Sequence, residues 1–310
     1  MNFPDTPPQK PALTLVVPIY NEEKALPPFF LELESLKKKI PEGLFLVFVD
    51  DGSRDRSSEL IEAYCNEQVK LVRHSRNRGY GAALKSGIAQ ASTELIAICD
   101  ADLTYPLSAL PPLLELIVEG NRMAIGKRPL AQQPLIRRPA KYFLNWFASY
   151  LSATKIEDLN SGLRIFRKQD ALRFSRMLPE GFSFTSTITM LLACEGHSLA
   201  YRPIRYRTRV GSSKISPVKD FFGFSLLVLR LSMAFNPLKV FAPLSIMLFA
   251  LSAFLLCVRL FFDELGLATT IVLFTAGMQL LATGLLADLV NRRLSAHDEA
   301  NTDSQNAPQR

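Results

Sequence analysis

The chain has 310 residues, of which 48% are hydrophobic and 21% are charged, and its net charge is +7. This length suffices for one large globular domain and a smaller unit, and the hydrophobic content excludes an intrinsically disordered protein. The four cysteines lie far apart, which excludes a zinc site with paired cysteines and a disulfide-rich domain. The positive charge favours an anionic partner, such as nucleic acid, a phosphorylated ligand or an acidic membrane surface.

Residues 1–12 contain four prolines and little apolar periodicity, so we expect a disordered N-terminus. They lack the apolar stretch of a signal peptide, and the domain that follows is expected to stay in the cytosol. From Leu13 onward, short apolar runs alternate with longer helical stretches. The predicted strands are Leu13–Val17, Leu44–Val49, Val69–Val72, Leu95–Cys99 and Met123–Gly126, and the predicted helices include Glu22–Lys39 and Leu107–Glu119. This order predicts an α/β domain with a mostly parallel sheet and helices on both faces.

Polar motifs follow the predicted strands at their carboxyl ends, where ligands bind in sheets of this kind. The motifs are Tyr20-Asn21-Glu22, Asp50-Asp51-Gly52-Ser53, Asp100-Ala101-Asp102 and Lys127-Arg128. Asp100 and Asp102, one residue apart beyond a strand, can coordinate a hard divalent cation that also bridges a diphosphate. Gly79-Tyr80-Gly81 precedes a helical stretch, but the sequence lacks the longer glycine signature of a dinucleotide site.

Two segments near the C-terminus, Val240–Val258 and Leu265–Ala287, contain no charged residue. Each has about 20 residues, enough for a helix to cross a hydrocarbon core of about 30 Å. Their connection is short, so the two helices form a hairpin whose flanks lie on one side of the membrane. Lysine and arginine are frequent in the flanks, whereas the connection holds Asp263 and Glu264. The positive-inside rule therefore places the flanks and the large domain in the cytosol.

The sequence before the hairpin mixes phenylalanine and leucine with charged residues, which predicts an interfacial helix over Pro217–Ala234. Gly277 and Gly284 in the second span permit close helix contact, so a homo-oligomer is allowed but not specified. The expected organisation is a disordered N-terminus (1–12), a cytosolic catalytic domain (13–216) and a juxtamembrane amphipathic helix (217–239). A transmembrane hairpin (240–290) and a disordered cytosolic tail (291–310) follow.

Taken in order, the motifs at residues 16–22, 50–53 and 100–102 resemble family 2 of the glycosyltransferases, which have the GT-A fold. Two later segments, Asp158-Leu159-Asn160-Ser161-Gly162-Leu163-Arg164 and Arg209-Val210-Gly211-Ser212-Ser213-Lys214, resemble its polyprenyl-phosphate hexosyltransferase group. That group contains dolichol-phosphate mannose synthase and bacterial undecaprenyl-phosphate glucosyltransferases, and the resemblance covers roughly residues 13–216.

The resemblance implies inverting transfer of a hexose from a nucleotide diphosphate sugar to a polyprenyl phosphate. The product would be a lipid-linked phosphosugar for glycan or cell-envelope biogenesis, made by a multi-pass protein of the inner membrane. A UDP-sugar is the favoured donor and GDP-mannose stays open, because no motif in the sequence identifies the sugar.

The same resemblance implies which residues form the site. The catalytic residues would be Asp100, Asp102, Arg209 and Lys214, with both aspartates binding Mn²⁺ or Mg²⁺. The nucleotide sugar would contact Pro18, Tyr20, Glu22 and one or both of Asp50 and Asp51. The lipid phosphate would face Arg128 and one of Arg137 and Arg138. Many relatives have glutamine where this chain has Thr104, a departure that predicts weaker metal binding.

Residues 202–214 carry several basic and no acidic side chains, a charge pattern suited to a diphosphate, a lipid phosphate and anionic headgroups. Arg202, Arg205 and Arg207 fit a strand with one solvated face, whereas Arg209 and Lys214 lie in a Gly/Ser loop that favours ligand closure. Nucleic acid is not the expected partner, since stacking aromatic residues and a recognition helix are not evident.

Two other functions compete with this interpretation. A processive polysaccharide synthase shares the fold and has membrane helices, but its relatives carry a Gln-x-x-Arg-Trp motif, and the single tryptophan here, Trp146, follows Asn145. A non-catalytic membrane scaffold that kept a glycosyltransferase shell is the second competitor. Binding of a divalent metal and a nucleotide would count against the scaffold.

Overall fold

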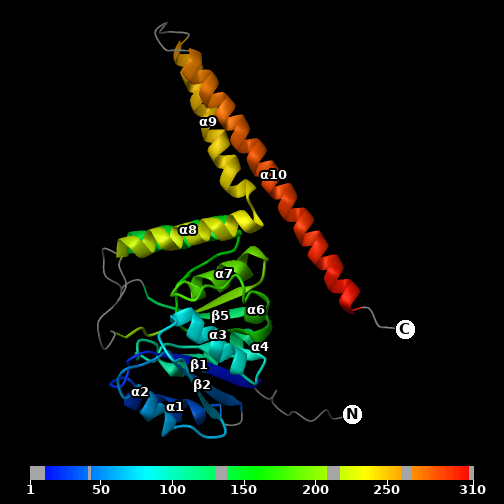
Figure 1. Ribbon diagram of the computed structural model, residues 1–310. Coiled ribbons are helices and arrows are strands. Elements are labelled where there is room, and N and C mark those ends of the chain that lie inside the picture. Colours follow the sequence, from blue (N-terminus) through cyan, green and yellow to red (C-terminus); the bar gives the residue numbers. More distant parts are fainter. Residues whose placement is uncertain (1–10, 41–42, 130–137, 208–216, 260–266, 307–310) are drawn as a thin grey trace, which may run out of the picture.

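The computed structural model describes residues 11–40, 43–129, 138–207, 217–259 and 267–306. It consists of a globular α/β domain, a long helix lying across one side of that domain, and a two-helix hairpin that extends away from it (Figure 1). The predictions made for residues 1–10, Arg137, Arg209 and Lys214 fall outside the described ranges.

Within these ranges, seven strands form one sheet in the order β3-β2-β1-β4-β6-β5-β7. The strands are β1 (Leu13–Ile19), β2 (Leu44–Asp50), β3 (Val69–Arg73), β4 (Leu95–Ile98), β5 (Met123–Lys127), β6 (Arg164–Arg167) and β7 (Leu199–Pro203). Only β6 runs antiparallel to its neighbours, β4 and β5. The predicted mostly parallel sheet is therefore confirmed.

Ten α-helices and a short 3₁₀ turn accompany the sheet in the described ranges. They are α1 (Leu26–Lys37), α2 (Ser57–Glu62), α3 (Tyr80–Gln90), η1 (Leu107–Ala109), α4 (Leu110–Val118), α5 (Arg138–Ser152), α6 (Lys168–Arg173), α7 (Phe184–Cys194), α8 (Pro217–Phe235), α9 (Leu238–Arg259) and α10 (Leu267–Asn306). The predicted helix from Glu22 begins later, at Leu26, because residues 21–23 bond instead to the loop after β2.

Side chains of each central strand alternate between two hydrophobic clusters, one on each face of the sheet. In β1, Leu15 and Val17 point into the cluster that contains residues of α1 and α4. Val16 points into the other cluster, which contains residues of α3, α5 and α7. Burial on both faces explains the continuous apolar runs of the sequence, and the expected helices on both faces are confirmed.

Two strands differ from the expectations in instructive ways. β6 was not predicted, since only Ile165 and Phe166 lie between its two terminal arginines and show no apolar period. β7 ends at Pro203, so Arg202 lies in a strand but Arg205 and Arg207 do not. Pro203 lies opposite Lys127, the last residue of β5, and the Ile204 N–H still donates to Lys127 O (3.0 Å), so β7 ends where its partner strand ends.

Helix α8 packs on α5 and α7 and has two different faces. Val228 and Leu231 are buried in the cluster beneath it, whereas Leu226 and Arg230 are exposed. The helix predicted over Pro217–Ala234 is present, but one face of it belongs to the core of the domain. Figure 1 shows α8 between the domain and the hairpin.

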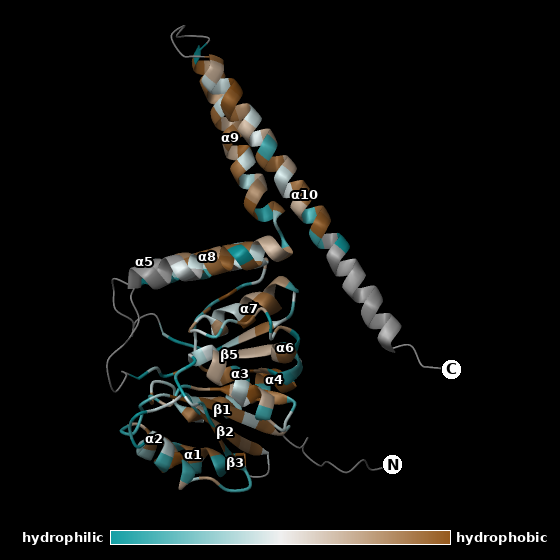
Figure 2. Cartoon of the chain, viewed as in Figure 1, coloured by the Kyte–Doolittle hydropathy of each residue, from teal (hydrophilic) through white to brown (hydrophobic). Residues whose placement is uncertain are grey.

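Helices α9 and α10 form the predicted hairpin. Two spans, Leu238–Arg259 and Leu267–Asn291, are long and apolar enough to cross a membrane, and only 11% and 17% of their most apolar windows are buried in protein. A core helix of a soluble protein would be mostly buried, so their apolar surface, brown in Figure 2, needs another cover. Gly277 and Gly284 face Phe249 and Phe241 of α9, so they serve packing within the hairpin.

The tail predicted to be disordered over 291–310 is helical as far as Asn306, as a continuation of α10. Starting a helix is costly, but extending one that packing already holds is not. The apolar span of α10 therefore supports helix in the polar residues that follow it.

Close packing between α3 and the sheet predicts a sensitive position at Gly87. A Cβ at this residue would lie 2.3 Å from Val16 Cγ1 and 3.0 Å from Val49 Cγ2, both in the core of the sheet. We expect Gly87→Ala to destabilise the protein by about 1–3 kcal/mol, because the strands cannot yield without moving their neighbours. Thermal unfolding in detergent measures this, with Gly181→Ala as control because no atom lies within 4 Å of a Cβ there. Equal melting temperatures for the two variants would contradict the expectation.

Candidate active site

The loops that follow β1 and β2 are joined by hydrogen bonds. The Asn21 N–H donates to Ser53 Oγ (3.0 Å), and Asn21 Oδ1 accepts from the Arg54 N–H (2.8 Å). The Glu22 N–H donates to Ser57 Oγ (2.9 Å). Asn21 adopts φ of 57°, a left-handed conformation that asparagine tolerates better than most residues. These contacts place the predicted nucleotide residues Tyr20 and Glu22 next to the end of β2.

Asp50 and Asp51 at the end of β2 are almost fully buried and have different partners. Asp50 Oδ1 accepts from the Ser53 N–H (2.9 Å), which closes the turn after the strand. Asp51 Oδ1 lies 2.7 Å from His74 Nδ1, and its two oxygens accept from the backbone N–H groups of Arg78 (2.9 Å) and Gly79 (2.8 Å). Asp51 thus holds the loop between β3 and α3.

Asp100, at the end of β4, is connected to that same loop. The Tyr80 hydroxyl donates to Asp100 Oδ1 (2.9 Å), and burial raises the pKa of Tyr80, which keeps this donor protonated. On the other side, a Cβ at Gly162 would lie 2.6 Å from Asp100 Oδ2. The approach of the backbone to the carboxylate therefore requires glycine at position 162.

Asp102 is oriented by Thr104, the residue that stands where glutamine was expected from the family resemblance. Asp102 Oδ1 accepts from both the N–H (3.1 Å) and the hydroxyl (2.6 Å) of Thr104, and both side chains are buried. Leu103 between them has φ of 63°, a strained conformation for a branched side chain. Strain of this kind is found at functional sites, where the surroundings enforce it.

The acidic pair has suitable chemistry for a divalent cation. Carboxylate oxygens are the ligands that Mg²⁺ and Mn²⁺ prefer. Among the described residues, no group of three or more His, Cys, Asp or Glu side chains could hold a metal. The predicted binding of a divalent cation by Asp100 and Asp102 stays a prediction.

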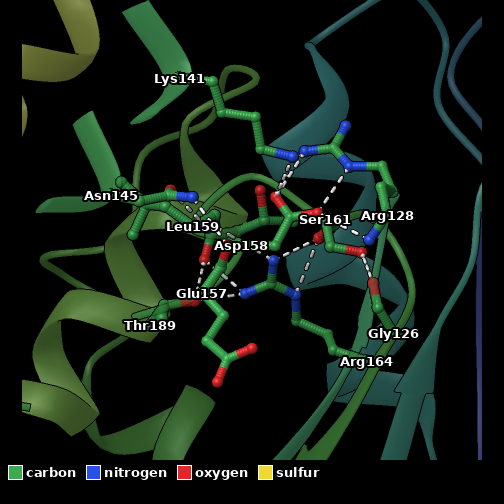
Figure 3. Close-up of polar contacts among 12 residues, drawn as sticks. Gly126, Arg128, Lys141, Asn145, Glu157, Asp158, Leu159, Ser161, Arg164 and Thr189 are labelled. Carbon is green, nitrogen blue, oxygen red and sulfur yellow. Dashed lines mark hydrogen bonds and ion pairs between the residues drawn. The ribbon is translucent and has the colours of Figure 1, made fainter. Parts of the chain in front are cut away.

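A second cluster lies beside the loop that carries Gly162. Arg128 contacts Asp158 through Nε (2.9 Å), Nη2 (2.8 Å) and its backbone N–H (3.1 Å). Lys141 Nζ of α5 lies 3.1 Å from Asp158 Oδ1, and Figure 3 shows both cations converging on this carboxylate. The three charges sum to +1, so the cluster remains attractive to an anion.

The protonation of this cluster follows from its burial. Burial alone would raise the pKa of Asp158, but the charges of Arg128 and Lys141 hold that pKa well below its usual range. A carboxylate so held is a poor base. Burial lowers the pKa of Lys141 from 10.5 to about 8, because Asp158 offsets only part of the cost of desolvating the ammonium group.

Arg164 fixes the loop from below. Its guanidinium is fully buried and donates to Ser161 O through Nε (3.1 Å) and to Thr185 O through Nη1 (2.6 Å), and burial lowers the pKa of Arg164 to about 10. Ser161 in turn donates its hydroxyl to Gly126 O (2.6 Å). Figure 3 shows Arg164 reaching under Ser161, on the far side of it from Lys141.

Most of the predicted site residues within the described ranges lie at the carboxyl ends of strands in one sheet. They lie at or just after the ends of β1 (Tyr20, Glu22), β2 (Asp50, Asp51), β4 (Asp100, Asp102) and β5 (Arg128). Arg138 begins α5, one turn before Lys141. His74, Tyr80, Lys141 and Arg164 were not predicted as site residues. His74 could have been found, because it directly follows β3 as the other motifs follow their strands, whereas Lys141 has no local signal in the sequence.

Two family models match the chain. Glycosyl transferase family 2 matches residues 14–175, which is more than half of the sequence, and the GtrB C-terminal hairpin matches residues 236–292. The chain belongs to glycosyl transferase family 2. The predicted family is thus confirmed, and the protein is a glycosyltransferase whose acidic pair and strand-end loops lie within the matched region.

Curated relatives match nearly the whole glycosyltransferase. A bactoprenol glucosyl transferase of Shigella phage SfV is 26% identical over 297 residues, covering 90% of this chain and 93% of that protein. An undecaprenyl-phosphate 4-deoxy-4-formamido-L-arabinose transferase of Pseudomonas aeruginosa is 28% identical, covering 91% of this chain and 86% of that protein. The similarity therefore includes the hairpin as well as the catalytic domain.

Solved structures confirm the GT-A fold. Glucosyl-3-phosphoglycerate synthase of Mycobacterium tuberculosis, in complex with Mn²⁺, UDP and phosphoglyceric acid, has a TM-score of 0.54 and 14% identity, covering 72% of this chain and 78% of that chain. Mannosyl-3-phosphoglycerate synthase of Rubrobacter xylanophilus has a TM-score of 0.53 and 16% identity, covering 71% and 72%. At these identities the likeness concerns the fold alone.

The lowered pKa of Lys141 predicts how stability depends on pH. Between pH 8 and 10.5 the unfolded chain keeps the Lys141 proton that the folded protein has released, so stability should rise with pH in this window. Relative to Lys141→Met, the wild type should gain up to about 3 kcal/mol across it. Urea unfolding in detergent at several pH values measures the difference.

Lys155→Met is the matched control, because the Lys155 side chain is 85% exposed and pairs with Glu157 on the same loop. Its stability should follow that of the wild type at every pH. A wild-type curve parallel to that of Lys141→Met would show that the buried ammonium has a normal pKa.

Proposed function

We propose that this glycosyltransferase moves a hexose from a nucleotide diphosphate sugar to a polyprenyl phosphate, with inversion, at the cytosolic face of the inner membrane. A UDP-sugar is the favoured donor, with GDP-mannose as the alternative. The product is a lipid-linked phosphosugar for cell-envelope or other glycan synthesis. The relatives named for bactoprenol and for undecaprenyl-phosphate support the acceptor class, since they match 90% or more of this chain.

One observation carries the proposal: helix α5 connects the Asp158 cluster to the membrane hairpin. In the middle of α5, Asn145 donates to Glu157 O (2.7 Å) and accepts from the Leu159 N–H (3.2 Å), the two neighbours of Asp158. Near the C-terminal end of α5, the Tyr150 hydroxyl donates to Lys239 O (3.3 Å) at the start of α9. An enzyme with a soluble acceptor has no need to fix its site to a hairpin.

The donor half of the proposal rests on the strand-end loops. The loops after β1 and β2 would surround the nucleoside, and the carboxylates of Asp100 and Asp102 would lie at the diphosphate. These two residues would hold a divalent cation, Mn²⁺ or Mg²⁺, which would supply positive charge to offset the charge that develops on the leaving nucleotide. Tyr80 and Thr104 keep the two carboxylates oriented for this contact. The Mn²⁺ in the Mycobacterium tuberculosis synthase complex supports a divalent metal.

The acceptor half rests on the net positive cluster. A lipid phosphate is already anionic near neutral pH, so its oxygen can attack the anomeric carbon without a general base. Asp158, with its lowered pKa, is then free for a structural role: it positions Arg128 and Lys141. These two cations would hold the acceptor phosphate by charge-assisted contacts. Arg138 would reach the same phosphate from the start of α5.

Exposed aromatic side chains on α5 support a membrane on this side of the domain. Tyr142, Phe143, Trp146 and Tyr150 are each at least 44% exposed, and Trp146 stacks on Tyr150. Tryptophan and tyrosine are enriched where a membrane meets water, because one part of the ring system is apolar and the other is polar. The Trp146 side chain is 53% exposed on α5. The residue before it is Asn145, not the arginine of the acceptor motif in processive synthases.

The first experiment is transfer from a panel of labelled nucleotide sugars to polyprenyl phosphate by the detergent-purified protein, with Mn²⁺ or Mg²⁺. One donor should give a labelled lipid in a metal-dependent reaction. Asp102→Ala should lower the rate at least about a hundredfold while the protein stays folded and membrane-bound, since the metal and diphosphate lose a ligand. Glu34→Ala, which removes an exposed carboxylate on α1, should leave the rate unchanged. Full activity of Asp102→Ala would exclude the metal assignment.

The single tryptophan makes the membrane proposal directly measurable. In lipid nanodiscs, Trp146 fluorescence should be quenched more by lipids brominated near the headgroup end of the acyl chain than by lipids brominated near its methyl end. As controls in a Trp146→Phe background, Met247→Trp, exposed in the middle of α9, should show the opposite order. Leu31→Trp, exposed on α1 at the far side of the domain, should show no quenching. If Trp146 fluorescence is not quenched, α5 does not lie at the membrane surface.

A further inference from the structure

His74 lies at the centre of a buried hydrogen-bond chain between β2 and α3. Its backbone N–H donates to Asp50 O (2.9 Å), which extends the pairing of β2 and β3 by one residue. Its side chain is only 5% exposed, with Nδ1 2.7 Å from Asp51 Oδ1 and Nε2 2.9 Å from Ser86 Oγ. The imidazole thus joins the end of a strand to the middle of the helix that packs over it.

The chemistry of the two partners fixes the hydrogen-bond roles of the imidazole. A carboxylate only accepts, so Nδ1 of His74 carries a proton and donates to Asp51. In the neutral imidazole, Nε2 accepts from the Ser86 hydroxyl; in the imidazolium, it donates to the same oxygen. Because a hydroxyl can do both, the two contacts persist in either charge state of His74.

Asp51 transmits this constraint to the next loop. The same carboxylate accepts from the N–H groups of Arg78 and Gly79, and Gly79 directly precedes Tyr80. The hydroxyl of Tyr80 bonds to Asp100. Gly79 has φ of +107°, and a Cβ there would lie 2.6 Å from Glu180 O, so the backbone has little freedom to compensate for a shift of Asp51.

We propose that His74 is a positioning residue for nucleotide-sugar binding. It fixes the carboxylate of Asp51 and, through that carboxylate, the backbone of Arg78 and Gly79 at the border of the donor site. The inference rests on the proposed function, since it takes the strand-end loops as the nucleotide-sugar site. His74 itself is buried behind Asp51 and acts through it.

Two substitutions separate the two contacts of His74. In His74→Asn, the side-chain amide takes the place of Nδ1 and keeps a donor to Asp51, while the contact with Ser86 is lost. In His74→Gln, the longer amide reaches the place of Nε2 and keeps Ser86, while the contact with Asp51 is lost. Ser86→Ala is the matched control for His74→Asn, because it removes the same bond from the other side.

The readout is nucleotide diphosphate binding to the full-length protein in detergent with Mn²⁺, measured by calorimetry with UDP and GDP. His74→Gln should weaken binding about tenfold, the effect of one hydrogen bond to a charged group. His74→Asn and Ser86→Ala should each weaken it less than about threefold. The KM for the nucleotide sugar should rise in His74→Gln with kcat within about twofold, a split that general loss of fold would not produce. Equal effects of His74→Asn and His74→Gln, or no effect of either, would overturn the proposal.

Hydrogen exchange provides a test that does not depend on the nucleotide. The amides of Arg78 and Gly79 should exchange faster in His74→Gln than in the wild type, and at nearly the wild-type rate in His74→Asn. If the wild type binds no nucleotide, the proposed function is wrong and the role of His74 in binding falls with it. If the wild type does bind and these amides exchange alike in all variants, the role of His74 alone is wrong.

Discussion

The site depends on keeping ionised carboxylates in place where they are almost completely buried, at the ends of parallel strands. Asp50, Asp51 and Asp102 are each less than a tenth exposed, and burying a charge is costly unless N–H and O–H groups satisfy it. The donors come mainly from the backbone of the loops that follow the strands, so each carboxylate also fixes a loop. The polar groups are therefore oriented before any ligand arrives, which is how a site stabilises charge that develops in a reaction.

Much of the fold could be predicted because parallel strands buried on both faces appear as continuous apolar runs in the sequence. β6 escaped prediction for the opposite reason. Arg164 is charged and yet fully buried, and it donates to the carbonyl group of Ser161 and to the Thr185 carbonyl and Thr189 hydroxyl of α7. Its partners on α7 are more than 20 residues away in the sequence, so the strand around it shows no local apolar pattern.

The candidate site, like the fold, could be predicted from the sequence only in part. The acidic pair and the motifs after β1 and β2 could be predicted, since the ends of parallel strands meet at one edge of the sheet. The partners of Arg128 could not, because Lys141 comes from a helix and Asp158 from a separate loop. Arg128 was predicted to face a lipid phosphate; the structure pairs it with Asp158, so an acceptor phosphate would meet an arginine that is already oriented.

The antiparallel strand β6 also has a consequence for biosynthesis. Strands β1 to β4 can pair as they leave the ribosome, but β4 keeps an open edge until residues 164–167 arrive to cover it. An open edge strand pairs readily with other chains, so this interval is when the nascent domain is most prone to aggregate. All seven strands precede α9 in the chain. The sheet can therefore close before the first apolar span has been synthesised, and the domain is complete when synthesis of the hairpin begins.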